Sequence, residues 1–276
     1  MMKRQLAGTR LGSIVMRVRD RLELMRGAVS DPSELGNLRN NALAGRLVTR
    51  LRRPNTTFID VGAHIGSVIG EALHNVPGRV IAFEAIPAKA DYLRARYPKV
   101  TIHNLALLDH DGETRFFIDN AQSGYSSLAM RKGDVTEITV KVARMDAIID
   151  AHDVDMIKID VEGAELGVLK GAENVIARCR PVVMFESGPG APMGYTQEQL
   201  WRWFNERDYL VYLPDRISRA AGPATLEVFV DSHEYPRRTT NYFGIPAERM
   251  KEVSARARVL LRDPPDATPP HGGARG

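Results

Sequence analysis

A short turn near residue 60 has the residue types of a ligand site. Asp60, Gly62 and Gly66 follow an apolar, β-rich run, and Glu84 stands 22 residues beyond Gly62 at the end of the next apolar run. Doubly wound folds bind their ligands outside the carboxyl ends of their parallel strands. A carboxylate after the second strand can accept hydrogen bonds from the hydroxyls of a ribose. The stretch therefore predicts a site for a ligand that contains a nucleoside.

The glycine spacing favours one class of nucleoside ligand over another. A dinucleotide fingerprint reads G-x-G-x-x-G, but His64 occupies the position of its central glycine. Asp60 would also repel a pyrophosphate and favour a cationic group. The spacing D-x-G-x-x-x-G is typical of enzymes that use S-adenosylmethionine (SAM), so we expect SAM. The structural alternative is a strand-to-helix turn with two glycines and no ligand.

Strands and helices alternate along the chain, which predicts a doubly wound α/β sheet that is mostly parallel. Apolar runs bounded by turn residues predict parallel strands at residues 57–61, 79–83, 100–105, 154–159 and 181–186. Further β runs are expected after Gly112 and at residues 135–142, and last strands at residues 209–213 and 226–230. Helices are expected from Ser67, between Pro87 and Pro98, over 145–150, around 166–179 with a break near Gly171, and after Thr196. The loops at residues 119–134 and 187–195 are expected to cover the site.

Length and composition predict one main domain with flanking pieces. A chain of 276 residues with 43% hydrophobic content can bury one large core. We expect a helical extension over residues 1–53, the main domain over 54–252 and a disordered, proline-rich tail over 253–276. A helix is predicted in the extension from Asp31 to about Leu51. The single cysteine, Cys179, rules out a disulfide framework and fits a cytoplasmic protein.

The formal net charge of +4 comes from the first 26 residues, which hold seven basic and two acidic side chains. A nucleic-acid partner is therefore not supported. The same segment has an apolar helical stripe that runs from Leu11 to Met25 with arginines around it. We expect the stripe to pack on protein, and we disfavour the alternative that it binds an anionic membrane surface.

Several motifs together resemble the FkbM family of SAM-dependent methyltransferases. The resemblance covers about residues 56–246, and one position departs from it, because His64 stands where the family pattern usually has Asn. The motifs are FIDVGAHIG, VIAFEAIP, HNLALLDHDGETRFF, GYSSL, KIDVEGAELGVLKGA, PVVMFE and NYFGIP. The resemblance implies a Rossmann-like class I methyltransferase fold with an antiparallel last strand.

The resemblance also implies roles for individual residues. The methionine portion and sulfonium of SAM would face Asp60, Gly62, Ala63, His64 and Gly66. The ribose would lie at Glu84 and Ala85, and the adenine near Asn104 and Ala106. Asp160 and Glu162 would border the transferable methyl group as catalytic residues. The structural alternatives are a solvated strand end for Glu84 and a helix N-cap for Asp160.

The expected reaction is methyl transfer from SAM to a hydroxyl oxygen of a sugar, glycan or other small metabolite. An NAD-dependent oxidoreductase and a non-catalytic SAM-binding protein are the alternatives. Asp160 and Glu186 follow neighbouring strands and could converge beside the methyl group. In one arrangement a divalent cation sits between them and holds the acceptor hydroxyl, and in the other Asp160 or Glu162 takes the proton directly. We expect the second, without a metal, because no third oxygen ligand can be named and hard cations want about six oxygens. The sequence does not identify the acceptor or the oligomeric state.

Overall fold

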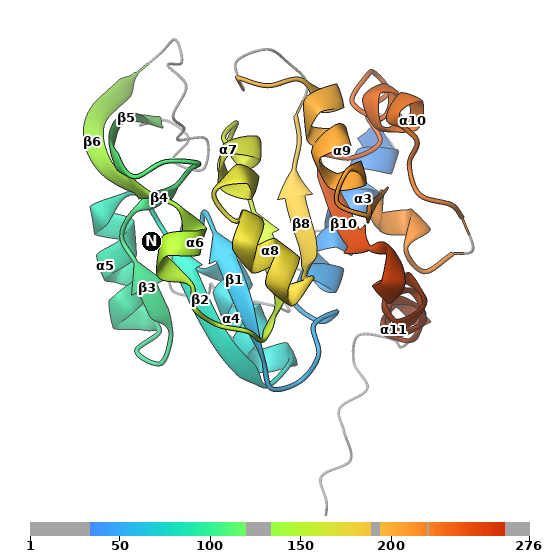
Figure 1. Cartoon of the computed structure of the whole chain (residues 1–276), viewed down its shortest axis with the longest axis horizontal. Helices are drawn as coiled ribbons and strands as arrows, with labels where there is room; N and C mark the ends of the chain where they lie inside the picture. Colours follow the sequence, from blue (N-terminus) through green and yellow to red (C-terminus); the bar gives the residue numbers. More distant parts are fainter. Residues whose placement is uncertain (1–33, 120–133, 189–193, 220, 263–276) are drawn as a thin grey trace, which may run out of the picture.

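The computed structural model describes residues 34–119, 134–188, 194–219 and 221–262. Its centre is a seven-stranded sheet in the order β3-β2-β1-β7-β8-β10-β9 (Figure 1). Its strands are β1 (Thr56–Val61), β2 (Gly78–Phe83), β3 (Thr101–His103), β7 (Val154–Ile159), β8 (Val182–Glu186), β9 (Tyr209–Tyr212) and β10 (Asn241–Pro246). The first five are parallel, and β10 runs antiparallel between β8 and β9. The predicted Rossmann-like sheet with an antiparallel last strand is confirmed.

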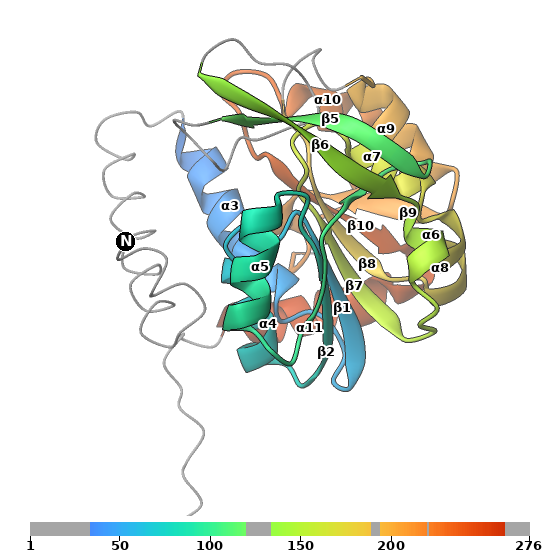
Figure 2. The ribbon, with the colours of Figure 1, turned by 90° about the vertical axis from the view of Figure 1, so that its left-hand side faces the viewer.

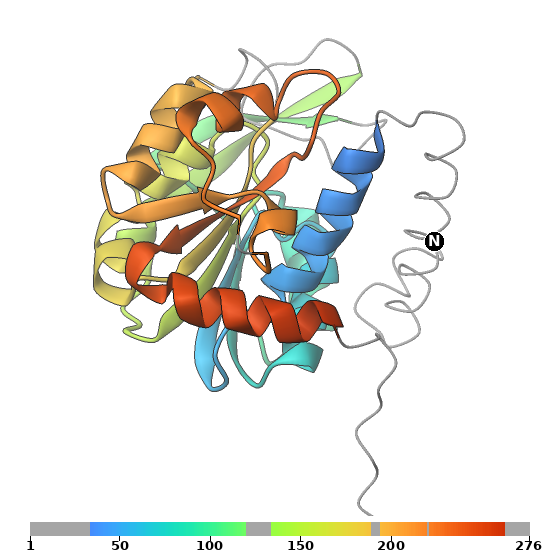
Figure 3. The ribbon, with the colours of Figure 1, turned by 90° about the vertical axis from the view of Figure 1, so that its right-hand side faces the viewer.

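Helices cover both faces of this sheet (Figures 2 and 3). One face carries α3 (Leu35–Val48), α4 (Ser67–Asn75), α5 (Pro87–Arg96) and α11 (Met250–Arg262). The other carries α6 (Met145–Ile148), α7 (Glu165–Lys170), α8 (Glu173–Cys179), α9 (Gln197–Asn205) and α10 (Leu226–Asp231). Two 3-10 turns, η4 (Pro214–Arg216) and η5 (Ala247–Arg249), complete the order.

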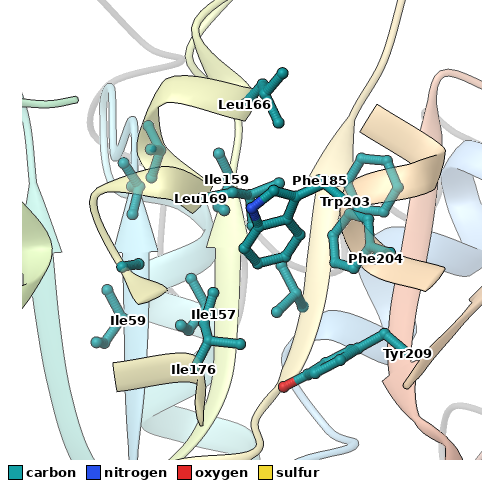
Figure 4. Packing of buried hydrophobic residues seen from close by; sticks show 14 of the residues in the cluster. Ile59, Ile157, Ile159, Leu166, Leu169, Ile176, Phe185, Trp203, Phe204 and Tyr209 are labelled. Carbon is teal, nitrogen blue, oxygen red and sulfur yellow. The ribbon is translucent and has the colours of Figure 1, made fainter. Parts of the chain in front are cut away.

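The central strands are buried on both faces, which explains why they read as continuous apolar runs. Every residue of β7 and all but the first of β1 are buried. Ile59, Ile157 and Ile159 point toward α7, α8 and α9, where they pack with Leu169 and Phe204 (Figure 4). The core therefore fixes where these two strands end, and the candidate site lies at those ends.

A second, three-stranded sheet of order β4-β6-β5 stands beside the carboxyl ends of the main strands (Figure 2). It consists of β4 (Ala106–Leu107), β5 (Gly112–Asp119) and β6 (Val135–Ala143). The predicted strand at residues 100–105 is shorter than expected, because the chain leaves the main sheet after β3 and joins this second sheet at β4. Phe116 and Val140 pack with Ile86, so the hairpin is held against the loop that follows β2.

The predicted strand at residues 226–230 is wrong, because this stretch forms α10. A run of five mostly apolar residues does not distinguish a buried strand from one buried helical turn. Thr225 stabilises the helix, since its side chain accepts a hydrogen bond from the Val228 amide and caps the first turn. The last strand is instead β10, which holds the NYFGIP motif.

The predicted tail is also wrong for residues 253–262, which belong to α11 with Val253 and Ala257 buried. Figure 3 shows α3 and α11 on the same face of the sheet, where Arg46 donates to the carbonyl of Leu260. Leu47 of α3 is fully buried in the same cluster. The predicted extension therefore shares a hydrophobic core with the main domain, and the packing does not stop at residue 53. The domain limits stay a proposal.

Several predictions fall outside the described residues. They are the apolar stripe from Leu11 to Met25, the GYSSL motif, most of the two expected site loops and the tail after Arg262. In the part of the chain that the structure covers, every helix is too short or too polar to cross a membrane.

Candidate functional site

A cavity of about 420 Å³ opens at the carboxyl ends of β1, β2, β7 and β8. Of the predicted site residues it brings together Gly62, His64, Glu84, Ala85, Ala106, Asp160 and Glu162. One part of its wall is apolar, with Ile86, Leu107 and Phe116. Another part is acidic, because Glu186 lines the cavity together with Asp160 and Glu162. A ligand in this cavity meets both apolar and anionic surfaces.

The turn between β1 and α4 is shaped by its contacts with the rest of the protein. Gly62 and Gly66 both have φ of +79°, and His64 has φ of +52°, in the left-handed region that Asn and His tolerate better than most residues. A Cβ on Gly62 would lie 1.9 Å from the carbonyl oxygen of Asp160, and one on Gly66 would lie 2.5 Å from a ring carbon of Tyr97. Neighbouring protein atoms therefore leave no room for a larger residue at Gly62 or Gly66, whether or not a ligand binds there.

Glu84 is held at the end of β2 by two backbone amides. The His64 amide donates to Oε2 at 2.8 Å and the Ile86 amide donates to Oε1 at 2.9 Å. The side chain is only 6% exposed, so it is not a solvated strand end. Burial raises the pKa of Glu84, while the Ile86 amide, the Lys89 charge and the His64 amide oppose that rise.

Four other predicted residues are absent from the cavity lining, namely Asp60, Ala63, Gly66 and Asn104. Asn104 donates to the carbonyls of Glu84 at 2.9 Å and Ala85 at 3.0 Å, so it positions the loop after β2. Asp60 is fully buried at the end of β1, and does not line the cavity as a residue facing the sulfonium would. Its Oδ1 accepts a hydrogen bond from Lys158 at 3.1 Å.

Lys158 connects the turn to the acidic part of the cavity, and sequence reasoning missed it. Its ammonium lies 3.2 Å from the carbonyl oxygen of Gly62 and 3.3 Å from Asp160 Oδ2, in addition to its bond with Asp60. Burial lowers the pKa of Lys158, but the charges of Asp60 and Asp160 outweigh this and raise it. The signal was available, because Lys158 and Asp160 are two residues apart and so share one face of a strand.

Asp160 and Glu186 form a coupled pair of carboxyl groups at the ends of β7 and β8. Burial raises the pKa of Asp160, but Lys158 and a hydrogen bond with Glu186 outweigh it, so the pKa of Asp160 lies below its ordinary value. Burial, followed by the charge of Asp160, raises the pKa of Glu186 to about 10. Asp160 is therefore the more acidic member of the pair. Their convergence was a correct expectation.

A further carboxylate, Glu165, fixes the loop that carries Glu162. Its Oε1 accepts hydrogen bonds from the amides of Gly163 at 3.1 Å and Val161 at 3.4 Å. Its Oε2 accepts a hydrogen bond from the hydroxyl of Tyr195 at 2.6 Å. Burial raises the pKa of Glu165, and the Tyr195 hydroxyl opposes that rise. Sequence reasoning did not single out Glu165 or Tyr195.

Asp160, Glu162 and Glu186 can each present a carboxylate oxygen within 4.8 Å of the others. The expectation that no third oxygen ligand could be named is therefore wrong, because Glu162 supplies one. Clusters of acidic groups are common without an ion, and three oxygens are about half of what a hard cation takes. The absence of a metal stays a prediction.

Comparison with known proteins finds one protein family. The family model described as the methyltransferase FkbM domain matches residues 60–211. Comparison with curated proteins finds no match.

Solved structures of methyltransferases are similar at low identity. A methyltransferase FkbM from Methylobacillus flagellatus is 18% identical with a TM-score of 0.43, and the similarity covers 84% of this chain and 60% of that one. A SAM-dependent methyltransferase from Aquifex aeolicus is 13% identical over 67% of this chain and 87% of that one, with a TM-score of 0.36. For a geranyl diphosphate C-methyltransferase from Streptomyces coelicolor the identity is 12%, the coverage 75% and 80%, and the TM-score 0.41.

The stretch matched by the family model begins at Asp60 and takes in the glycine turn, Glu84 and the Asp160 carboxylate pair. It is more than half of the chain, and the chain therefore belongs to the FkbM methyltransferase family.

Proposed function

We propose that this protein transfers a methyl group from SAM to a hydroxyl oxygen of a sugar, glycan or other small metabolite. The observation that carries the proposal is one cavity lined both by Glu84, a carboxylate suited to a ribose, and by Asp160, a carboxylate held ionised by a lysine. Binding of a nucleoside and removal of a proton can then take place in the same cavity.

The residues present fit SAM. Each oxygen of Glu84 accepts one backbone N–H, and a carboxylate offers about four acceptor positions, which leaves about two for ribose hydroxyls. Ile86, Leu107 and Phe116 provide an apolar wall suited to the adenine ring. The acidic wall suits the sulfonium, because opposite charges attract strongly where water is excluded. Asp60 and Asn104 contribute indirectly, since they position the turn and the loop after β2.

Asp160 is proposed as the base of the reaction. SAM, when bound, supplies a methyl group that is open to attack by an oxygen nucleophile. An alcohol has to lose its proton as it attacks, and a positioned base typically contributes about 10²- to 10⁴-fold to such a step. Asp160 is ionised and lines the cavity, so it can accept that proton. Glu162 lines the same wall and can accept a hydrogen bond from a second hydroxyl of the acceptor.

A single-turnover assay tests this function directly. Purified protein, SAM carrying a labelled methyl group and extracts of sugars and glycans should give a labelled product whose formation depends on Asp160. Asp160→Asn should lower the rate by about 10²-fold or more. Metabolite mass spectrometry after deletion of the gene should reveal a species lighter by one methyl. An Asp160→Asn variant with the full wild-type rate would show that Asp160 is not the base.

The same assay separates the alternatives. A non-catalytic SAM-binding protein would bind SAM and release no labelled methyl. An NAD-dependent oxidoreductase would change the absorbance of the nicotinamide and leave SAM intact. Activity that vanishes under EDTA and returns with Mg²⁺ would show that the metal-free mechanism is wrong. Action in the cytoplasm and the absence of a nucleic-acid partner stay part of the proposal.

A further inference from the structure

The side chain of Lys158 joins two parts of the site that the sequence places far apart. It lies on β7, is 6% exposed, and contacts Asp60 Oδ1 at 3.1 Å and Asp160 Oδ2 at 3.3 Å. Asp60 precedes the glycine turn, and Asp160 stands at the acidic wall of the cavity. One buried ammonium is thus shared by two carboxylates, which leaves a net negative charge on the three groups.

Asp160 has a second close neighbour, because a carboxylate oxygen of Glu186 lies within 4.8 Å of one of its own. Two ionised carboxylates this close repel each other, which favours a state in which one of the two carries a proton. The ammonium of Lys158 contacts Asp160 and stabilises negative charge there. The geometry therefore assigns the proton to Glu186 and the charge to Asp160.

We propose that Lys158 is a positioning residue that keeps Asp160 as the ionised member of the Asp160–Glu186 pair, so that Asp160 takes the proton of the acceptor. This inference rests on the proposed methyl transfer. In that reaction the O–CH₃ bond forms, the S–CH₃ bond breaks, and the acceptor proton passes to Asp160. The pair then holds two protons and returns one to water, while Lys158 remains protonated throughout.

The groups around the pair come from several elements and act in the expected directions. Glu162 and Glu165 add negative charge that also raises the pKa of Glu186, and the His64 charge lowers that of Asp160. Further titratable groups near the pair include Asp60 on β1, Lys158 on β7 and Tyr195, whose hydroxyl donates to Glu165. Among these groups, Lys158 is the cation that touches one carboxyl group of the pair.

Carboxyl-carbon NMR of the full-length protein with ¹³C-labelled Asp and Glu tests this assignment without the acceptor. Glu186→Gln and Asp160→Asn identify the two signals. Lys158→Met alone would leave Asp60 buried without its cation, so the test uses Asp60→Asn/Lys158→Met, which removes both charges. Lys158→Arg keeps the cation, and Asp60→Asn alone is the matched control.

In the wild type and in Lys158→Arg, Glu186 should be protonated at neutral pH and Asp160 ionised. In the double variant the midpoint of the Asp160 titration should rise by about one pH unit or more above that in Asp60→Asn. An unchanged Asp160 midpoint in the double variant would overturn the inference. The inference would also be overturned if Glu186 of the wild type titrated in the ordinary range of a glutamate, or if added Mg²⁺ deprotonated Glu186 at neutral pH.

Failure of the proposed function would look different. The two signals would then titrate as described, while no labelled methyl would leave SAM with any acceptor. That result would overturn methyl transfer, and with it the assignment of Asp160 as the base.

Discussion

Gly62 and Gly66 fix the turn against two neighbouring elements before any ligand binds. Gly62 lies against the backbone of Asp160 at the end of β7, and Gly66 lies against Leu93 and Tyr97 at the end of α5. The Tyr97 hydroxyl also donates to the carbonyl of Gly66 at 2.9 Å. A turn held in this way needs little rearrangement on binding, so less of the binding free energy is spent on ordering it.

Gly62→Ala should therefore lower the free energy of unfolding by about 2 kcal/mol or more, because the new Cβ meets a backbone oxygen and φ is positive. Gly45→Ala is the matched control. Gly45 lies inside α3 with nothing within 4 Å of an added Cβ, so alanine there should stabilise by about 0.5 to 1 kcal/mol. Urea unfolding of both variants measures the difference, and equal stabilities would contradict this explanation of the turn.

Glu186 should make stability depend on pH. Its pKa is about 10 in the folded protein against an ordinary value of 4.5. The stabilising contribution of the protonated form is complete below the ordinary pKa and is lost as pH rises toward the folded pKa. Between these values the wild type should lose up to about 1.4 kcal/mol of its free energy of unfolding per pH unit relative to Glu186→Gln, which cannot titrate. Urea unfolding at about pH 6 and about pH 8 checks this. Parallel curves for the two proteins would contradict the raised pKa.

At the scale of elements, α11 completes the helical layer that α3, α4 and α5 begin. Val253 and Ala257 are buried in the cluster that includes Leu47 and Leu51. Arg256 also donates to the carbonyl of Arg52, at the end of the segment that leads into β1. The helix therefore covers the part of this core that includes Phe243 and Ile245 of β10.

A chain that ends at residue 249 should lose about 2 kcal/mol or more of stability relative to one that ends at residue 262, because it no longer buries Val253 and Ala257. The chain that ends at Arg262 should match the full protein, and it serves as the control for the truncation itself. Thermal unfolding of the three proteins measures both effects. If removal of residues 263–276 alone caused the whole loss, the proposed role of α11 would be wrong.

The elements that carry the site could be predicted because burial on both faces makes their strands continuous apolar runs. Residues 226–230 form a similar apolar run in a short helix, and apolar composition alone does not show that Thr225 caps a helix there. In α11 the buried positions Val253 and Ala257 stand among arginines, a pattern that does not by itself distinguish a packed helix from the start of the predicted tail.

Within the site, Glu84 and Asp160 could be predicted because each follows a recognisable strand. The spacing of Lys158 and Asp160 indicates a shared strand face, but the contact of Lys158 with Asp60 could not be predicted, since it depends on the register that pairs them across β1 and β7. The separation of Asp60 from the cavity depends on that same pairing. Sequence spacing identifies which residues reach the edge of the sheet, and the register decides which of them touch.

At the scale of the whole molecule, the site lies where the main sheet, the β5–β6 hairpin and the loops after β2 and β7 meet. The sheet contributes the carboxylates, and the hairpin contributes Phe116 to the apolar wall. Under the proposed function, the nucleoside would lie beside β2 and β4, and the acceptor beside β7 and β8. The central claim is therefore that Glu84 anchors the ribose of SAM in this cavity.

Calorimetric titration of SAM into the wild type, Glu84→Ala and the exposed control Glu113→Ala tests that claim most directly. The wild type and Glu113→Ala should bind SAM and its demethylated product equally well, and neither should bind NAD. Glu84→Ala should weaken SAM binding by about 1.5 to 3 kcal/mol, since two hydrogen bonds to a charged acceptor are lost. Unchanged affinity in Glu84→Ala, or binding of NAD in place of SAM, would contradict the account.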